Sequence, residues 1–192
     1  MPSQIVSLVV NGEQREFIAA PGATLLASLR ESLGLTAAKR GCAQGACGTC
    51  TVLIDGRPEV SCLVAVETVA DRSIRTLEGV AAGGELDEVQ SAFIDCFATQ
   101  CGFCTAGMIM VAEELLDRNP DPSEENVVEA ISGNVCRCTG YRPIVIAILE
   151  AARRRRERAP QGWCRDDLPA RPDRHEHLHR RTGRRGYGSG RR

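Results

Sequence analysis

Three features are scarce or absent in this chain, and each absence argues against a class of function. Aromatic residues make up only 4% of the 192 residues, with a single Trp, so the aromatic platform on which single-stranded nucleic acid stacks is missing. No apolar run reaches the roughly eighteen residues that a membrane-spanning helix needs. The N-terminal segment also lacks the basic and apolar blocks of a secretion signal. The sequence therefore predicts a folded, cytoplasmic protein with no nucleic-acid partner and no stable membrane insertion.

Cysteine, by contrast, is abundant, with ten in the chain. Because the cytosol keeps thiols reduced, a disulfide framework is a rare explanation for so many cysteines there. Metal binding or redox chemistry is the default interpretation. Eight of the ten fall into two groups along the sequence, which are Cys42, Cys47, Cys50 and Cys62, and then Cys101, Cys104, Cys136 and Cys138.

The first half of the chain has the alternation and the turns of a small β-sheet. Asn11-Gly12 and Asp55-Gly56 suit the positive φ angles of tight hairpins. Thr24 is expected to cap a short helix that packs across the sheet. Five strands are predicted, over residues 5–10, 13–20, 51–55, 58–66 and 73–78.

From residue 85 the apolar pattern becomes helical. Pro120 ends the second helical stretch, and Ser123 is a suitable cap for the third. Together with the strands upstream, this pattern predicts an α+β fold. Four helices are expected, over residues 85–100, 103–119, 123–134 and 141–158.

The C-terminal end differs in composition from the rest of the chain. Residues 1–152 hold 10 Lys and Arg against 20 Asp and Glu, whereas residues 153–192 hold 14 Arg against 5 Asp and Glu. The segment also has almost no aliphatic residues, so it cannot bury enough surface to offset the entropy of ordering. The expected organisation is a β-rich domain over residues 1–80, a helical domain over 81–157 and a basic, disordered tail over 158–192.

The first cysteine group predicts a 2Fe-2S cluster. Cys42, Cys47 and Cys50 follow the spacing of plant-type ferredoxins, and Cys62 supplies the fourth thiolate. Glycines between them allow the loop to wrap closely and to direct N–H groups at sulfur. A four-thiolate zinc site is the alternative, but such sites pair cysteines two to four residues apart on both sides. The spacing here favours iron and sulfide over zinc.

The second cysteine group predicts another cluster. Cys101 and Cys104 are expected at a helix start, where free N–H groups favour the thiolate. Alone, this pair could be a thioredoxin-like dithiol, but no βαβ pattern surrounds it. Cys136 and Cys138 are expected at the start of the last helix, and the single residue between them is too short a spacing for zinc. Four thiolates from two facing helix starts would hold a second 2Fe-2S cluster.

Three arginines stand beside these cysteines in the sequence. Arg40 precedes the first group, whereas Arg137 and Arg142 accompany the second. Positive charge near a cluster offsets its negative charge and raises its reduction potential. An ordinary solvated surface arginine is the alternative for each of them.

The motifs GCAQGACGTCTV, TQCGFCTAGM and NVCRCTGYRPIV together resemble the iron-sulfur subunit of the molybdenum hydroxylases. Xanthine dehydrogenase, aldehyde oxidoreductase and aerobic carbon monoxide dehydrogenase contain similar modules. The resemblance covers about residues 4–152 and includes all eight cysteine positions in order. It implies a plant-type ferredoxin-like (β-grasp) N-terminal domain followed by a four-helix 2Fe-2S domain.

The resemblance also implies cofactors and partners. A large subunit would hold a molybdopterin-type cofactor and a medium subunit would hold FAD, in a dimer of heterotrimers. Gln100 and Cys138 match family positions that contact the pterin. Electrons would pass from molybdenum to the second cluster, then to the first, then to the flavin. A free-standing two-cluster carrier with no molybdenum partner is the competing hypothesis.

Overall fold

The computed structural model describes residues 4–81 and 84–158. The predicted tail, apart from Arg158, lies outside the described residues. Within them, no helix is long and apolar enough to cross a membrane. The strands are β1 (Gln4–Val10), β2 (Glu13–Ala19), β3 (Thr51–Ile54), β4 (Arg57–Val60) and β5 (Ser73–Arg75). The α-helices are α1 (Leu25–Ala27), α2 (Glu88–Asp95), α3 (Thr105–Arg118), α4 (Glu124–Ile131) and α5 (Arg142–Arg158).

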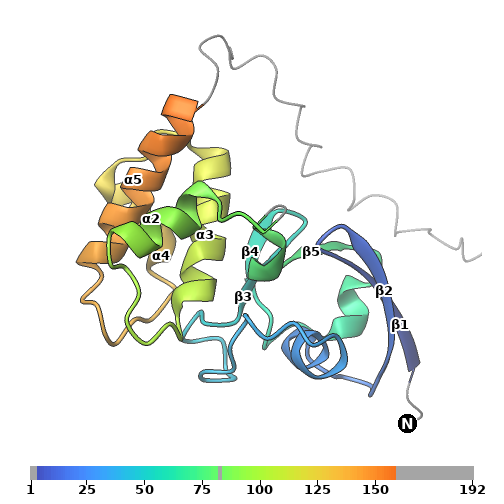
Figure 1. Ribbon diagram of the computed structural model, residues 1–192. Helices are drawn as coiled ribbons and strands as arrows, with labels where there is room; N and C mark the ends of the chain where they lie inside the picture. Colours follow the sequence, from blue (N-terminus) through green and yellow to red (C-terminus); the bar gives the residue numbers. More distant parts are fainter. Residues whose placement is uncertain (1–3, 82–83, 159–192) are drawn as a thin grey trace, which may run out of the picture. The chain divides into compact units, whose positions relative to one another are not determined.

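The five strands form one mixed sheet in the order β2-β1-β5-β3-β4 (Figure 1). β1 pairs antiparallel with β2 and parallel with β5, whereas β3 pairs antiparallel with both β4 and β5. Asn11 and Gly12 join β1 to β2 with φ angles of 53° and 83°, and Asp55 and Gly56 join β3 to β4 with 49° and 74°. Both hairpin turns predicted from these dipeptides are therefore confirmed.

One face of the sheet is covered by a short helical segment. Thr24 caps α1 by accepting a hydrogen bond from the Ala27 N–H, as predicted. The helix then widens into a π-helical turn, Ser28–Ser32. Apolar residues of this segment meet alternate residues of the strands in a buried cluster that includes Leu8, Val10, Leu25, Leu26, Leu29, Val52, Ile54 and Ile74.

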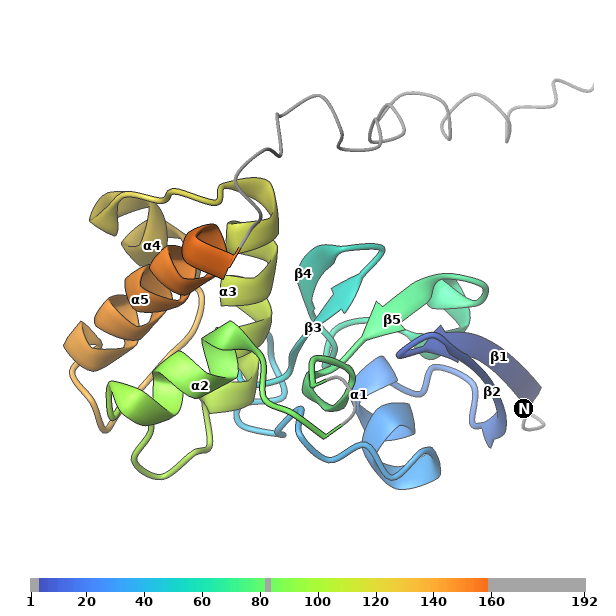
Figure 2. The ribbon, with the colours of Figure 1, turned by 45° about the horizontal axis from the view of Figure 1, so that its top comes forward.

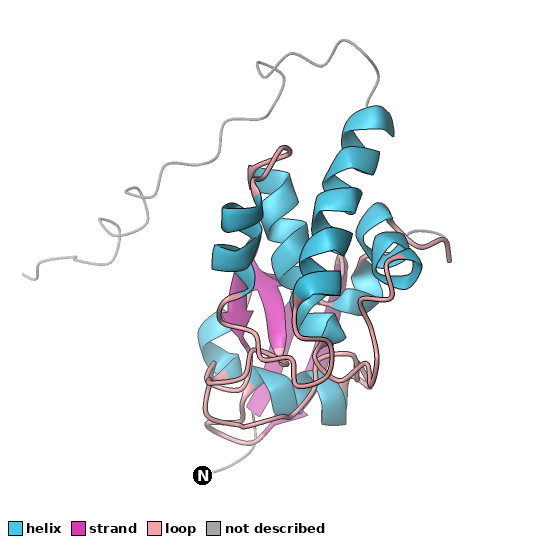
Figure 3. Ribbon diagram, turned by 90° about the vertical axis from the view of Figure 1, so that its left-hand side faces the viewer, coloured by secondary structure: helices cyan, strands magenta, loops and turns pink. Residues whose placement is uncertain are grey.

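β3 is buried on both faces because it lies between two layers (Figure 2). Val52 and Ile54 point into the core beneath α1. Leu53, which points the opposite way, packs with Val80 and with Met110 of α3. The helical half of the chain therefore rests directly on the sheet (Figure 3).

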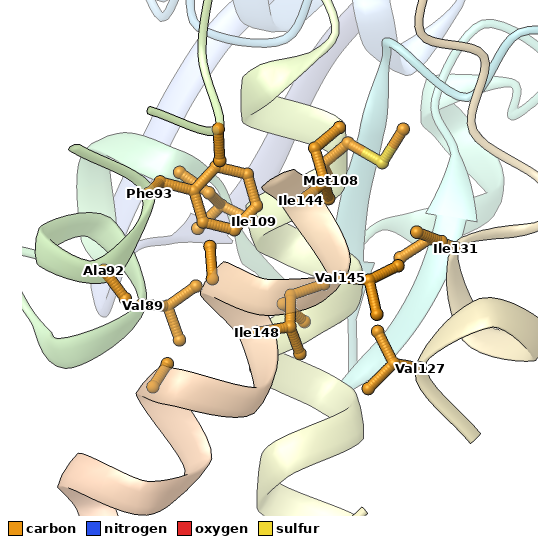
Figure 4. Packing of buried hydrophobic residues seen from close by; sticks show 14 of the residues in the cluster. Val89, Ala92, Phe93, Met108, Ile109, Val127, Ile131, Ile144, Val145 and Ile148 are labelled. Carbon is orange, nitrogen blue, oxygen red and sulfur yellow. The ribbon is translucent and has the colours of Figure 1, made fainter. Parts of the chain in front are cut away.

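The four helices α2 to α5 enclose a core of their own. Figure 4 shows Val89 and Phe93 of α2 near Ile148 of α5, with Val127 of α4 on the other side. Ser123 caps α4, as predicted, and it does so in a capping box. Asp87 forms a second capping box at the start of α2. The helices thus begin where side-chain oxygens can accept the unpaired N–H groups of the first turn.

Several predicted elements are shorter in the structure. The strand expected over 58–66 ends at Val60 because Ser61 turns the chain, with its N–H and its hydroxyl both bonded to the Cys50 carbonyl. The strand expected over 73–78 ends at Arg75 and continues as a 3-10 turn. The helix expected over 85–100 ends at Asp95, since Phe97 has a φ of 52°.

A buried carboxylate connects the sheet to the helices. Glu113 of α3 is only 2% exposed and pairs with Arg155 of α5 at 2.5 Å and with Arg75 of β5 at 3.1 Å. Arg155 also pairs with Asp87 at 3.0 Å. Burial, and then a hydrogen bond with the Asp87 carboxyl, raises the pKa of Glu113 to about 8, although the two arginines act in the opposite direction.

We expect this carboxylate to make stability depend on pH. The pKa of Glu113 is higher in the folded state than in the unfolded state. Its contribution to the free energy of unfolding is therefore fully present below about pH 4.5 and is lost as the pH rises through about 8. The comparison of the wild type with Glu113→Gln isolates this effect, because other titrating groups are common to both. The measurement is the urea midpoint of each protein from pH 6 to 9. Parallel curves for the two proteins would contradict the expectation.

Candidate metal centres

Three cysteines of the first group, Cys42, Cys47 and Cys50, lie on the loop between the π-helical turn and β3. We call residues 41–50 the first cysteine loop. Ala43, Gly45 and Gly48 have φ angles of 54°, 79° and 68°, so the loop coils tightly. The coil directs two backbone N–H groups, those of Gln44 and Ala46, at the Cys42 sulfur at 3.5 and 3.3 Å.

The four thiols of this group form two pairs. Cys47 is among the groups that shift the pKa of the Cys42 thiol, and Cys62 is among those that shift the pKa of the Cys50 thiol. Cys62 lies in the turn after β4, not on the strand as predicted. The Ser61 hydrogen bonds to the Cys50 carbonyl hold this turn beside the end of the first cysteine loop.

The two pairs differ in their electrostatics. The Gln44 N–H, followed by the Cys47 side chain, lowers the pKa of the Cys42 thiol to about 7. Burial raises the pKa of the Cys50 thiol to about 11. Because the thiolate is the form that binds a metal, Cys42 is the more readily ionised candidate ligand at neutral pH. Cys42 and Cys47 are half-buried, whereas Cys50 and Cys62 are buried and shielded from water.

The second group lies in two loops that precede helices. Cys104 is the residue before α3, whereas Cys101 lies three residues further upstream. Cys136 and Cys138 lie ahead of α5, which begins only at Arg142. The prediction that both pairs lie at helix starts is therefore right for Cys104 and wrong for the other three.

These four thiols also form two pairs. The sulfurs of Cys101 and Cys138 are 3.5 Å apart and exposed. Cys104 and Cys136 each influence the pKa of the other and lie deeper. Each pair therefore takes one thiol from each loop.

Side chains of the following residues hold Cys136 in place. The Cys136 N–H donates to the Tyr141 hydroxyl at 3.0 Å, and that hydroxyl donates to the Asn134 carbonyl at 3.3 Å. Thr139 forms a hydrogen bond with the Cys136 sulfur at 3.2 Å. Tyr141 reaches back because its φ of 68° reverses the chain just before α5.

Each pair of the second group contains one thiol with a lowered pKa and one with a raised pKa. The Phe103 N–H lowers the pKa of Cys101, and the hydrogen bond with Cys101 raises that of Cys138. Burial raises the pKa of Cys104 to about 12. Burial opposes ionisation of Cys136 as well, but hydrogen bonds headed by the Thr139 hydroxyl lower its pKa overall.

The loops that carry the two cysteine groups touch each other. We call residues 134–138 the Cys-Arg-Cys loop. The Val135 N–H donates to the Cys47 carbonyl at 2.9 Å, and the Asn134 side-chain amide donates to the Gly48 carbonyl at 2.9 Å. Gly107 of α3 lies against the same carbonyl.

Sequence reasoning did not identify Asn134, Gly107 or Tyr141. A glycine in the middle of an otherwise helical pattern is the one signal that marks Gly107, since such a residue usually has a packing reason. Nothing in the sequence alone indicates that Asn134 meets a loop 86 residues upstream.

The arginines near the cysteines have carboxylate partners in two of three cases. Arg40 pairs with Glu31 at 2.7 Å, and Arg142 pairs with Glu124 at 2.6 Å. Arg137 is exposed. Two of these charges are thus offset by neighbours, which weakens the idea that they tune cluster potentials.

Gln100 and Cys138 are the two predicted pterin contacts. Gln100 is exposed and directly precedes Cys101 in the sequence.

The donor set suits binuclear clusters. Each iron of a 2Fe-2S cluster takes two thiolates, and each group offers four thiols. Backbone N–H groups and hydroxyls at the sulfurs are the hydrogen bonds that such clusters use.

Comparison with known proteins agrees with this chemistry. Residues 8–82 match the family described as 2Fe-2S iron-sulfur cluster binding domain, and residues 76–149 match the 2Fe-2S binding domain family. The two matches meet near residue 80, where the β-rich half gives way to the helical half.

Individual relatives point to one kind of protein. The small FeS subunit of nicotinate dehydrogenase from Eubacterium barkeri is 46% identical over 149 residues, which are 78% of this chain and 95% of that subunit. The small subunit of nicotine 6-hydroxylase from Paenarthrobacter nicotinovorans is 48% identical over 146 residues, covering 76% and 88% of the two chains. A chain of quinoline 2-oxidoreductase from Pseudomonas putida 86 superposes with a TM-score of 0.75 at 46% identity, covering 79% and 97%. The chain therefore belongs to the family of iron-sulfur small subunits of the molybdenum hydroxylases, in which it is an electron-transfer subunit of an oxidoreductase complex.

Proposed function

We propose that the two cysteine groups are the ligands of the two clusters. The first cluster would be held by Cys42, Cys47, Cys50 and Cys62, and the second by Cys101, Cys104, Cys136 and Cys138. The observation that carries the proposal is the approach of the thiols within each group, since the Cys101 and Cys138 sulfurs are 3.5 Å apart and the turn at Ser61 holds Cys62 beside Cys50. Each iron of a 2Fe-2S cluster takes two thiolates, so four thiols in each group suit one cluster. When bound, such clusters accept and donate single electrons.

The residues around each cluster have separate tasks. The first cysteine loop supplies N–H donors to sulfur, and the turn at Ser61 brings Cys62 beside Cys50. Tyr141 and Thr139 fix the position of Cys136. Hydrogen bonds of this kind set ligand orientation and reduction potential.

We further propose the direction of electron flow. The second cluster would receive electrons from a large molybdopterin-binding subunit, and the first would pass them to a medium FAD-binding subunit. The exposure of Cys101, Cys138 and Gln100 supports this, since all three are free to meet a partner that carries the pterin. In this assignment, Gln100 and Cys138 contact the pterin, and the complex is a dimer of heterotrimers.

The same proposal includes two domains, residues 1–80 and 81–157. Two separate buried clusters support the division, one beneath the sheet and one among α2 to α5. The small contact of Leu53, Val80 and Met110 lies between them. A free-standing carrier is the weaker hypothesis, because the relatives with the same span are named as subunits.

Metal analysis and spectroscopy of the native complex test the proposal. We expect four irons and four sulfides per chain, for two clusters, and two distinct electron paramagnetic resonance signals after reduction. The complex should also contain a large and a medium subunit. Zinc in place of iron, or one cluster signal, would refute the ligand assignment. A monomeric chain that exchanges electrons rapidly in solution would favour the free-standing carrier.

A further inference from the structure

Phe97, just after α2, combines two features that are unfavourable for the chain on its own. Its φ of 52° lies in the left-handed region, which a bulky side chain adopts only with strain. The residue is also 82% exposed, more than any other large apolar residue in the described part of the chain. A ring in water gains little from the burial that makes phenylalanine stabilising. The fold of this chain therefore does not offset the strain.

The turn at the end of α2 explains the left-handed backbone. The Phe97 N–H donates to the Ile94 carbonyl at 3.1 Å, and the Ala98 N–H donates to the Phe93 carbonyl at 2.9 Å. These two hydrogen bonds form a Schellman motif in which Cys96 is the C-cap. The residue after the C-cap of this motif is usually glycine, because glycine has no Cβ to clash. The backbone thus favours glycine at the position that phenylalanine occupies.

Other residues with a positive φ have a local reason for it. Six residues other than glycine have one in the described part of the chain, of which three are Asn or Asp and one is Ala. Asn and Asp tolerate this conformation because their side chains are short and polar. Tyr141 is the other aromatic residue, and its hydroxyl bonds to the Cys136 N–H and to the Asn134 carbonyl. The exposed hydrocarbon ring of Phe97 makes no such bond.

The surface around Phe97 is apolar and nearly free of charge. Ile94, one turn earlier on α2, is 61% exposed. Between residues 89 and 104 the single charged residue is Asp95, although 26% of the whole chain is charged. Asp95 pairs with Arg154 of α5 at 2.7 Å. Aromatic residues and few charges are typical of the core of a protein interface.

The position of Phe97 indicates which partner covers it. Gln100 is three residues further along, so the Cα atoms of the two residues are at most about 10 Å apart. The loop that carries both runs to the same end of the helices as the Cys-Arg-Cys loop (Figure 1), where the Cys101 and Cys138 sulfurs are 3.5 Å apart. An interface of ordinary size buries about 800 Å² on each partner, a patch roughly 30 Å across. A large subunit that covers Gln100 and Cys138 therefore also covers Phe97.

We propose that Phe97 is the aromatic anchor by which this chain docks on its large subunit, with Ile94 as the neighbouring apolar contact. The inference rests on the proposed function, which supplies the large subunit as the partner. An apolar pocket of that subunit would bury the ring and give it, in the complex, the contact that the chain alone does not provide. This contact offsets the strain at positive φ.

The test is the dissociation of the native complex, followed by mass photometry over a dilution series. Phe97→Gly is the decisive variant, because glycine suits the left-handed turn and the change removes only the ring. We expect the concentration at which half of the complexes have lost this chain to rise by about thirtyfold, as for truncation of an aromatic hot spot. Phe97→Leu should be intermediate, and Ile94→Ala should have a smaller effect than Phe97→Gly.

Two controls separate the anchor from effects on the backbone. Phe97→Asn should weaken the complex as much as Phe97→Gly, because asparagine also tolerates positive φ but does not add the flexibility of glycine. Val128→Ala truncates another exposed apolar residue, on α4 at the other side of α5 (Figure 4), and should leave the midpoint unchanged. A wild-type midpoint in Phe97→Gly, or equal weakening in Val128→Ala, would overturn the inference. Loss of the medium subunit in place of this chain would do the same, since Phe97 would then belong to a different interface.

Subunit masses and iron content distinguish this inference from the proposed function. A native wild-type complex without a large subunit refutes the proposed function. If the wild type holds a large subunit and Phe97→Gly binds it equally tightly, only the anchor is wrong. Each variant should keep the iron content of the wild type, because none of the changed residues is a proposed ligand. Loss of iron in Phe97→Gly would give the ring a structural role within the chain and would also overturn the anchor.

Discussion

Replacing Cys104 with Ala should remove the second 2Fe-2S cluster and leave the first in place, so that the iron content falls from four atoms per chain to two. Cys104 is a proposed ligand of the second cluster, and alanine has no atom that can replace its thiol. One iron would keep a single protein thiolate, and a cluster with an open coordination position is released or hydrolysed. Iron and sulfide analysis with electron paramagnetic resonance of the reduced protein measures the loss.

The first cluster should survive because its loop depends on a different core. Cys50 and Cys62 are packed among residues of the sheet and of α1. Cys104 contacts the core of α2 to α5 instead. A change in the helical core therefore leaves the ligands of the first cluster supported.

Cys96→Ala is the matched control for this experiment. Cys96 caps the end of α2, is half-buried and packs against the same helical core as Cys104. It lies outside both ligand groups, so its loss should leave all four irons in place. Two resonance signals in Cys104→Ala, or one in Cys96→Ala, would overturn the ligand assignment.

The sequence was most informative where a local rule determines the structure. Asn11-Gly12 and Asp55-Gly56 predicted both hairpins because few other dipeptides adopt positive φ so readily. Thr24 and Ser123 predicted helix starts because their side-chain oxygens accept the unpaired N–H groups. In each case the residue and its partner are close in sequence.

The ends of the elements were harder to predict, because contacts with distant residues determine them. The strand after Asp55-Gly56 continues as an apolar pattern to Val66, yet it stops at Val60 since Ser61 bonds to Cys50. The same spacing of apolar residues is compatible with a continuing strand and with a turn that buries Cys62 in the core. The spacing alone therefore could not distinguish a strand from a turn at this point.

The candidate site shows the same division. Ligand spacing predicted eight cysteines as candidate ligands, because a cluster restricts the chain between its ligands. It did not show that each pair of the second group takes one thiol from each loop, nor that Asn134 meets Gly48. Those facts depend on how the loops pack, which no motif of this chain encodes.

Replacing Gly107 with Ala should destabilise the chain by about 2 kcal/mol, within the range for overpacking a buried position. A Cβ at this position would be 2.2 Å from the Gly48 carbonyl oxygen and 2.9 Å from the side-chain nitrogen of Asn134. The carbonyl belongs to the backbone and already accepts the hydrogen bond from Asn134, so it cannot turn aside. The first cysteine loop must instead move away from α3.

Helix propensity acts in the other direction but is too small to compensate. Alanine is favoured over glycine in a helix interior by about 1 kcal/mol. Gly107→Ala would therefore increase the stability of the chain if there were space for the added Cβ. Gly133 offers the matched comparison, because an added Cβ there would meet nothing within 4 Å. Gly133→Ala should therefore leave the stability nearly unchanged.

The measurement is the half-life of cluster absorbance in urea, compared among the wild type, Gly107→Ala and Gly133→Ala. We expect Gly107→Ala alone to lose its clusters faster, with the first cluster lost before the second because its loop is the one displaced. The double variant with Asn134→Ala should be less damaged than the sum of the two single changes, since residues in contact do not act independently and the shorter side chain leaves room for the new methyl group. Additive effects, or a Gly107→Ala protein as durable as Gly133→Ala, would show that α3 and the first cysteine loop are not in the close contact on which the arrangement of the two clusters depends.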